Sequence, residues 1–373
     1  MTATFRIGRV AGVDVGVNWS VLVVFGLIAW LLAAGRFPSG YPGQPAWAYV
    51  VAGLAAAVVF LAGLLAHEVS HAVVARHHGI QVEGITLWMF GGVARLKGEP
   101  RSPGADLRIA GVGPLVSIAL GLVFGAVAAV MAVAGQTGLV FGTFVWLAGI
   151  NIFLALFNAL PAAPLDGGRI LRAALWAWRG DRKWAAVMAA RAGRVLGGAL
   201  ILFGLWQFLA APGLGGLWLA LIGWFLFGAA GLEEQQAQVG AALAGVHVRD
   251  IMSADPETAP SDITVAELVD RHLMPSKHSA FPIVAEGRLS GLVTLNRIRR
   301  VPREHWADTK VRDVACTADE LTIASPDEPV TDLLPRLNEC ADGRALVVRD
   351  GNLIGIVSPT DISRALQRSA LQS

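Results

Sequence analysis

Two histidines and a glutamate lie inside an otherwise apolar stretch of the chain. His67, Glu68 and His71 form the pattern H-E-x-x-H within LAGLLAHEVSHAVVARHHG, residues 61–79. On a helix, residues four apart lie on the same face, so the two imidazoles can reach one zinc ion. Zinc lowers the pKa of a coordinated water toward about 7, and the intervening glutamate can accept the proton. The pattern therefore predicts a hydrolytic zinc site.

The apolar surroundings favour this interpretation over a chance occurrence of the motif. In a soluble helix the two are about equally common. In a membrane span, three neighbouring ionisable groups are costly unless they share a polar site, and one cation satisfies all three. His77 and His78 lie beside Arg76 at the polar end of the stretch. We expect these two to be solvated interface residues without a catalytic role.

Composition indicates a membrane protein with a soluble tail. The chain has 373 residues, of which 54% are hydrophobic and 16% charged, whereas soluble domains carry about 25% charged residues. Apolar sequence dominates as far as about residue 232, and ordinary soluble sequence follows. We therefore predict a membrane domain at 1–231 and a linker at 232–245. No basic cluster is interleaved with aromatic residues, so nucleic acid is not an expected partner.

Six segments approach the length of about 20 apolar residues that crosses a bilayer. The first apolar run is longer than the core of a cleaved signal peptide, so we expect it to be retained. The predicted spans are Val17–Gly35, Trp47–Ala75, Ile109–Ala134, Leu139–Leu160, Ala185–Ala211 and Leu214–Gly231.

Positive charge in the loops predicts the orientation of these spans. Lysine and arginine concentrate after spans two and four, whereas the opposite loops carry only Arg36. Loops rich in lysine and arginine stay in the cytoplasm. Both termini and the soluble tail are therefore expected to be cytoplasmic, with the active site inside the membrane toward the cytoplasmic side. The basic residues are Arg76, Arg95, Lys97, Arg101, Arg108, Arg169, Arg172, Arg179, Arg182 and Lys183.

A β-hairpin is predicted between spans two and three. In ITLWMFGGVARL, Ile85, Leu87 and Met89 alternate with Thr86 and Trp88, and two glycines follow. This is strand and hairpin patterning. Its free edge could pair with an unwound substrate by strand addition, or it could be an ordinary cytoplasmic hairpin. The expected fold is thus a mostly α-helical polytopic membrane domain, with about six transmembrane helices and this small hairpin.

A third metal ligand is expected from the end of span four. Pro161 and Pro164 interrupt the helix there. Asp166 follows at once, and Gly167 and Gly168 permit tight backbone turns. An aspartate just past a span can also be a simple interfacial cap. However, a simple cap does not need two prolines before the aspartate and two glycines after it, so this combination favours a metal ligand.

Together, HEVSH at 67–71 and NALPAAPLDGGR at 158–169 resemble the site-2 protease family of intramembrane zinc metalloproteases. In that family the second motif is N-x-x-P-x-x-P-x-D-G-G. The resemblance implies that His67, His71 and Asp166 bind one zinc ion per chain and that Glu68 is the general base. It also implies that Asn158 hydrogen-bonds the substrate carbonyl or its developing oxyanion.

The resemblance covers nearly the whole membrane domain. Residues 89–96, MFGGVARL, resemble the family's loop between the second and third spans. Residues 111–117, GVGPLVS, resemble its G-P-x-x-N segment, except that Ser117 replaces the usual asparagine. This departure does not touch the implied metal ligands.

The soluble tail contains two copies of one unit. Val311-Arg312-Asp313 repeats Val248-Arg249-Asp250 about 63 residues later, and short strands alternate with amphipathic helices in each copy. The tail resembles a tandem pair of CBS domains, an α/β regulatory module that often binds adenine nucleotides between its halves. We expect these domains at 246–303 and 304–373.

In the CBS family the second hairpin ends in G-h-h-[S/T]-x-x-D, where the hydroxyl approaches phosphate and the aspartate holds ribose. The second copy matches this pattern with Ser358 and Asp361. The first copy keeps Thr294 but has Arg297 where aspartate is usual. The resemblance therefore implies at most one intact adenine-nucleotide site. A purely structural role, or homodimerisation through the CBS domains, is an open alternative.

The cysteines, Cys316 and Cys340, both lie in the tail and form no close-spaced pair. We expect ordinary thiols in a reducing compartment, not a disulfide or a metal site.

The leading hypothesis is an intramembrane zinc endopeptidase that cuts transmembrane segments of other proteins, after a first cut elsewhere has shortened them. A CBS-regulated transporter or channel is the alternative, and it predicts polar residues recurring in several spans. The polar groups instead concentrate in spans two and four. A non-catalytic relative that only binds membrane partners is a third alternative, which the complete motif set disfavours.

Overall fold

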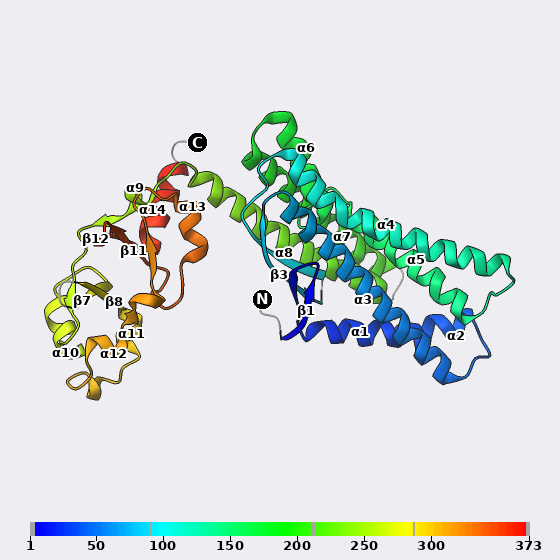
Figure 1. The fold of residues 1–373 in the computed structure, drawn as a ribbon, viewed down its shortest axis with the longest axis horizontal. Helices are drawn as coiled ribbons and strands as arrows, with labels where there is room; N and C mark the ends of the chain where they lie inside the picture. The colour runs from blue at the N-terminus through cyan, green and yellow to red at the C-terminus, as the bar shows by residue number, and fades with distance from the viewer. Residues whose placement is uncertain (1–3, 90, 211–213, 286–287, 371–373) are drawn as a thin grey trace. The chain divides into compact units, whose positions relative to one another are not determined.

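The computed structural model describes residues 4–89, 91–210, 214–285 and 288–370 (Figure 1). It divides into two compact units, Met1–Ala237 and Gln238–Ser373. The helices that begin in the first unit are α1 (Ser20–Leu31), α2 (Phe37–Gly40), α3 (Ala46–His77), α4 (Pro103–Val133), α5 (Leu139–Asn158), α6 (Asp166–Arg179), α7 (Arg182–Ala210) and α8 (Leu214–Ala242).

The six predicted spans are confirmed by six helical segments, among the described residues, that are long and apolar enough to cross a membrane. Large apolar side chains on them face outward, as a hydrocarbon solvent requires; Val133 and Leu209, for example, are 91% and 80% exposed. The predicted end of span five, Ala211, lies outside the described residues. The segments are Ser20–Gly40, Ala46–His77, Pro103–Val133, Leu139–Asn158, Arg182–Ala210 and Gly215–Ala242.

The predicted hairpin belongs to a larger sheet than the sequence suggested. Its four strands, in spatial order, are β1 (Phe5–Val10), β2 (Val13–Val17), β3 (Gln81–Trp88) and β4 (Gly91–Lys97). The β3–β4 hairpin lies between spans two and three, as predicted. Strand β2 runs parallel to β3, with Val15 opposite Ile85, while the other pairs are antiparallel.

The start predicted for span one is wrong, because Val17 ends strand β2 and the helix begins at Ser20. Val13 and Val15 are buried while Asp14 between them is exposed. This alternation is typical of a strand with one buried face. Val13 packs against Ala72 of α3 and Ile85 of β3, which secures the sheet to the second span.

Helices α3 to α6 form the part of the membrane unit that carries the predicted site. Helix α4 packs against α3, α5 and α6, and Figure 1 shows α4 and α5 side by side along their length. Helix α3 has 32 residues, which corresponds to about 48 Å at 1.5 Å per residue. It therefore exceeds the hydrocarbon thickness of about 30 Å and holds the H-E-x-x-H motif within its last three turns.

The second unit contains two sheets built from the two repeats. The first has the spatial order β6-β7-β8-β9 and the second the order β10-β11-β12-β5. The strands are β5 (Ser253–Ala254), β6 (Ala259–Pro260), β7 (Ala280–Ala285), β8 (Arg288–Thr294), β9 (Cys316–Thr317), β10 (Thr322–Ala324), β11 (Ala345–Arg349) and β12 (Asn352–Val357). The helices are α9 (Val248–Ile251), α10 (Val265–Leu268), α11 (Leu295–Arg299), α12 (Val311–Val314), α13 (Val330–Leu333) and α14 (Pro359–Ala370).

Each repeat contributes one short strand to the sheet formed mainly by the other repeat. Strand β5, from the first repeat, pairs with β12 of the second, and β9, from the second repeat, pairs with β8 of the first. Each sheet nevertheless has its own apolar core. Phe281 and Ile283 lie in the core of the first, and Val347 and Val357 in that of the second.

The prediction that the cysteines remain thiols is wrong, because Cys316 and Cys340 form a disulfide bond. They are 24 residues apart in the sequence. The strand exchange places β9 beside the loop that precedes β11, so that their Cα atoms lie 6.0 Å apart. This separation lies within the range that a disulfide requires.

Candidate metal centre

The side chains of His67, His71 and Asp166 converge on one point inside the membrane unit. Both histidine Nε2 atoms lie 3.2 Å from Asp166 Oδ2. The two Nε2 atoms also lie 3.2 Å from each other. His67 and His71 are buried on α3, and Asp166 begins α6. Three metal-ligating atoms from two helices therefore form a nearly equilateral triangle.

The size of this triangle fits a tetrahedral zinc ion. Zinc–nitrogen and zinc–oxygen bonds of about 2.0–2.1 Å at tetrahedral angles place neighbouring ligand atoms about 3.3 Å apart. The observed sides of 3.2 Å match this value. A set of two histidines and one carboxylate also leaves a fourth position for a reacting group, which is the pattern of a catalytic site.

Helix α4 fixes the orientation of both imidazole rings. His71 Nδ1 donates a hydrogen bond to the carbonyl oxygen of Ile109 at 2.6 Å. His67 Nδ1 lies 2.9 Å from Ser117 Oγ, and Ser117 is fully buried. Such partners hold the Nδ1 proton and leave the Nε2 lone pair free for a metal. The expectation that the replacement of asparagine by Ser117 does not touch the metal ligands is wrong, because Ser117 lies beside His67.

Tight backbone packing brings Asp166 to the histidines. After α5 ends, Ala163 N donates to Ala189 O of α7 at 3.3 Å, and Leu165 N donates to Ala162 O at 3.0 Å. The peptide bond between Ala163 and Pro164 is cis. A Cβ on Gly168 would overlap the backbone of residue 163, so glycine is required where α6 starts. The loop thus turns sharply enough to place the first residue of α6 at the metal site.

A buried ion pair holds α6 against α4. Asp106 is fully buried and accepts two hydrogen bonds of 2.8 Å from Arg172, with Arg169 3.5 Å away. Bidentate arginine–carboxylate pairs fix relative orientation as well as distance. In the sequence, Arg169 and Arg172 mark the topology, and Arg169 also ends the second motif. Their further role is to anchor the helix that carries Asp166.

Glu68 lies between the metal site and the sheet. Its Oε1 accepts a hydrogen bond from Gly92 N at 3.2 Å. Gly92 belongs to β4, which is an edge strand of the sheet. The carboxylate next in sequence to His67 is thus connected to the backbone of a strand with an open edge. Sequence reasoning predicted the hairpin and the base separately, and the structure brings them together.

Comparisons with known proteins decide the family. The model described as "Peptidase family M50" matches residues 55–136 and 132–203, and the model for the CBS domain matches residues 248–304 and 311–368. The chain is 45% identical over 368 residues to "Putative zinc metalloprotease Rip3" of Mycobacterium tuberculosis, covering 98% of this chain and 93% of that protein. The chain belongs to peptidase family M50.

A second relative and a solved structure are also similar to this chain. "Zinc metalloprotease MJ0392" of Methanocaldococcus jannaschii is 30% identical over 309 residues, covering 83% of this chain and 84% of that protein. The solved "Site-2 Protease from Methanocaldococcus jannaschii" is 26% identical and covers 62% of this chain and 94% of that chain, with a TM-score of 0.43. The protein is a multi-pass membrane metalloprotease of the M50 family with a tandem CBS pair, and its family is one of zinc enzymes.

The described hydrogen bond of the Asn158 side chain is not made to His67, His71 or Asp166. Asn158 Nδ2 donates to Leu154 O at 3.1 Å, within its own helix α5. Nδ2 carries a second N–H, which is the donor that a contact with a substrate carbonyl would use. A role in binding the substrate carbonyl stays a prediction.

The CBS residues occupy the expected hairpin ends. Asp361 Oδ2 accepts hydrogen bonds from Ser358 Oγ at 2.6 Å and Ser358 N at 2.9 Å, so the pair caps α14. In the first repeat, Thr294 is buried and caps α11 by accepting from Arg297 N at 3.4 Å. The Arg297 guanidinium hydrogen-bonds Val314 O, so it is engaged with protein where the family places a ribose-binding carboxylate.

Proposed function

We propose that this protein is an intramembrane zinc endopeptidase that hydrolyses peptide bonds within or near transmembrane segments of other membrane proteins. The observation that carries the proposal is the 3.2 Å triangle of His67 Nε2, His71 Nε2 and Asp166 Oδ2 inside a membrane unit. These three residues would hold the zinc ion. When bound, zinc supplies the Lewis acidity that activates water for attack on a peptide carbonyl.

The chain's own residues would then move the proton and hold the substrate. Glu68 accepts the proton of the attacking water and passes it to the leaving amine. Asn158 would donate to the carbonyl oxygen as negative charge develops there. The edge of β4 can pair with an extended segment of substrate, which keeps an unwound transmembrane helix hydrogen-bonded. The contact between Gly92 and Glu68 supports placing that segment beside the base.

The decisive experiment separates metal binding from catalysis in the purified full-length protein. We expect Glu68→Gln to retain about one zinc per chain and to lose cleavage of a transmembrane substrate by at least about 100-fold. His67→Ala should lose both zinc and activity. His77→Ala is a matched control, because this histidine is exposed on the same helix and bonds only to Val73 O in the described structure. Wild-type cleavage by Glu68→Gln would refute the mechanism.

The proposal includes the orientation of the protein. The basic loops after spans two and four support cytoplasmic termini, with the CBS pair also in the cytoplasm. The bond cleaved, and the need for a first cut elsewhere, depend on the substrate. Comparison of membrane proteomes from cells that express wild-type protein or Glu68→Gln would identify fragments that accumulate only in the variant. Reporter fusions at each terminus test the orientation.

We further propose that the second CBS repeat binds an adenine nucleotide. A cavity of about 500 Å³ has a mixed polar and apolar lining, in which the polar residues are Asp250, Ser253, Asp361, Arg364, Arg368 and Ser369. The two arginines supply charge for phosphate, and the carboxylate of Asp361 could bind ribose. Titration of the full chain with ATP, ADP and AMP tests this role, with Asp361→Asn expected to weaken binding. Sedimentation with and without nucleotide tests homodimerisation through the CBS pair.

A further inference from the structure

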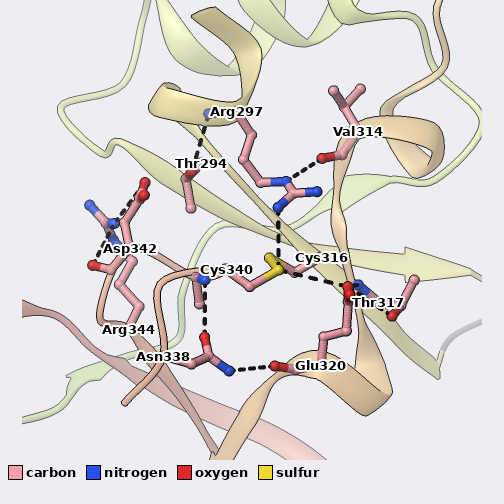
Figure 2. The surroundings of a disulfide bond; sticks show 11 residues. Thr294, Arg297, Val314, Cys316, Thr317, Glu320, Asn338, Cys340, Asp342 and Arg344 are labelled. Atoms are coloured by element: carbon pink, nitrogen blue, oxygen red, sulfur yellow. Dashed lines mark hydrogen bonds and ion pairs between the residues drawn. A yellow bond between two sulfur atoms is a disulfide. The ribbon is translucent and has the colours of Figure 1, made fainter. Parts of the chain in front are cut away.

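The Cys316–Cys340 disulfide joins the two sheets of the CBS unit (Figure 2). Cys316 lies in β9, which pairs with β8 in the first sheet. Cys340 lies in the loop before β11, a strand of the second sheet. The bond therefore crosses from one sheet to the other. These are also the only two cysteines in the 373-residue sequence.

The two cysteines differ in how exposed they are. Cys316 is fully buried, whereas Cys340 is partly exposed. A dissolved thiol can therefore reach the Cys340 sulfur first. Attack on that sulfur releases Cys316 as the leaving thiolate, and the reverse reaction begins when Cys316 attacks an oxidised Cys340. Thiol–disulfide exchange at this bond is therefore expected to begin at Cys340.

Arg297 is placed to make the free thiol of Cys340 reactive and to favour release of Cys340 from a mixed disulfide, which is the second step of reduction. Its Nη1 lies 3.2 Å from Cys340 Sγ, and its Nε donates to Val314 O, which holds the guanidinium in place (Figure 2). A neighbouring positive charge stabilises a cysteine thiolate, which is the reactive form. Arg297, which replaces the expected ribose-binding aspartate, is therefore close enough to stabilise a thiolate at Cys340.

The other charged groups around the sulfur oppose this effect only in part. Glu320 Oε2 lies 3.7 Å from Cys340 Sγ and disfavours a thiolate. However, this oxygen also accepts hydrogen bonds of 3.1 Å from both the N–H and the hydroxyl of Thr317, which disperse its charge. Arg344 and Asp342 form an ion pair at 3.6 Å in the same loop and largely cancel each other.

We propose that Cys316–Cys340 is a thiol–disulfide exchange site, with Cys340 as the sulfur that reacts first and a dithiol as the reductant. In reduction, the dithiol attacks Cys340, Cys316 leaves as a thiolate and takes up a proton, and the second thiol of the reductant releases Cys340. The protein disulfide thus becomes a pair of thiols, and the dithiol reductant becomes a disulfide. Oxidation by a dissolved disulfide runs the same steps in reverse. Disulfides that form in the cytoplasm are usually of this exchangeable kind.

Thiol counting on the full-length protein tests reversibility. Cells are quenched with acid and the protein is alkylated with a maleimide–polyethylene glycol, so that each free thiol adds one gel shift. We expect no shift after diamide treatment and two shifts after brief treatment of the native protein with dithiothreitol. A bond that opens only after denaturation is structural, and that result would overturn the proposal. Two free thiols under every cellular condition would overturn it equally.

Charge variants in a Cys316→Ser background test the role of Arg297, because only Cys340 then reacts. We expect Arg297→Gln to slow alkylation of Cys340 about three- to fivefold and Glu320→Gln to accelerate it by a similar factor. Arg297→Lys should restore part of the rate. In the matched Cys340→Ser background, buried Cys316 should react far more slowly. Equal rates in all the charge variants would contradict the assignment, whether or not the protein cleaves any substrate.

The same three side chains could instead hold a metal, since donor atoms of Cys316, Glu320 and Cys340 lie within 4.8 Å of one another. Zinc analysis of the reduced chain distinguishes the two. Exchange alone predicts the same zinc content before and after reduction. A second zinc per chain that appears on reduction and is lost in Cys340→Ser would overturn the exchange assignment.

Discussion

Gly113 of α4 packs against His71 of α3 so closely that a Cβ at position 113 would overlap the Nε2 atom. The same Cβ would lie 2.6 Å from His67 Nε2. Gly113→Ala should therefore displace both metal-ligating nitrogens. Overpacking of this kind costs about 1–3 kcal/mol, which corresponds to about 5- to 150-fold in zinc affinity. Chelator competition on the purified protein measures it.

Gly111 provides the control for that experiment. It lies two residues away on the same helix, and a Cβ there meets no atom within 4 Å. Gly111→Ala should retain zinc and stabilise α4 slightly, because alanine favours a helix more than glycine does. If both variants keep full zinc affinity, the packing of α4 against the histidines does not constrain the metal site.

Ser117→Ala removes the oxygen 2.9 Å from His67 Nδ1. The ring then loses the partner that fixes its orientation, so zinc affinity should fall by about 10- to 100-fold. Ser117→Asn, which introduces the residue usual in the family segment, should retain most of the affinity. Equal affinity in wild type and Ser117→Ala would show that this hydrogen bond does not position His67.

Gly92→Ala should separate catalysis from metal binding. A Cβ at this position would overlap Glu68 Cγ and lie 2.9 Å from Oε1, whereas His67, His71 and Asp166 are not among its nearest atoms. We expect full zinc content and a loss of at least about tenfold in kcat, because small displacements of a general base are costly. Loss of zinc together with activity would mean that β4 supports the whole site and not the base alone.

Asp106→Asn should destabilise the membrane unit. It leaves Arg172 and Arg169 without their buried carboxylate, and breaking a buried ion pair costs about 3–5 kcal/mol. We expect the thermal midpoint in detergent to fall by about 6–20 °C. Asp14→Asn is the comparison, since the Arg9–Asp14 pair is highly exposed and should contribute under about 1 kcal/mol. Similar midpoints for both variants would contradict a clamp between α4 and α6.

The predictable part of the site is the part set by local spacing. His67 and His71 are one helical turn apart, so the helix alone places them together. Asp166 was singled out by the prolines and glycines around it and by the family resemblance, since no local rule brings a residue 99 positions from His67 to the same point. Ser117 and Gly113 touch the histidines only through the packing of α4 on α3. A glycine and a serine four residues apart gave no chemical signal of their own.

The missed features of the fold have similar physical origins. Strand β2 has only five residues and lies just before an apolar helix, so its alternation merged with the span. The disulfide depends on the exchange of strands between the two repeats. This exchange brings new segments together, but it leaves no trace in the repeat pattern of the sequence. Hydropathy alone was sufficient for the six spans, because length and composition determine what can cross a bilayer.

The exchange of β5 and β9 between the two sheets has a consequence for how the tail folds. Neither repeat can complete its sheet alone, since each would lose an edge strand to the missing half. A chain cut between the repeats would yield two fragments with unpaired edges, which are prone to aggregate. The CBS pair is therefore expected to unfold in a single cooperative transition.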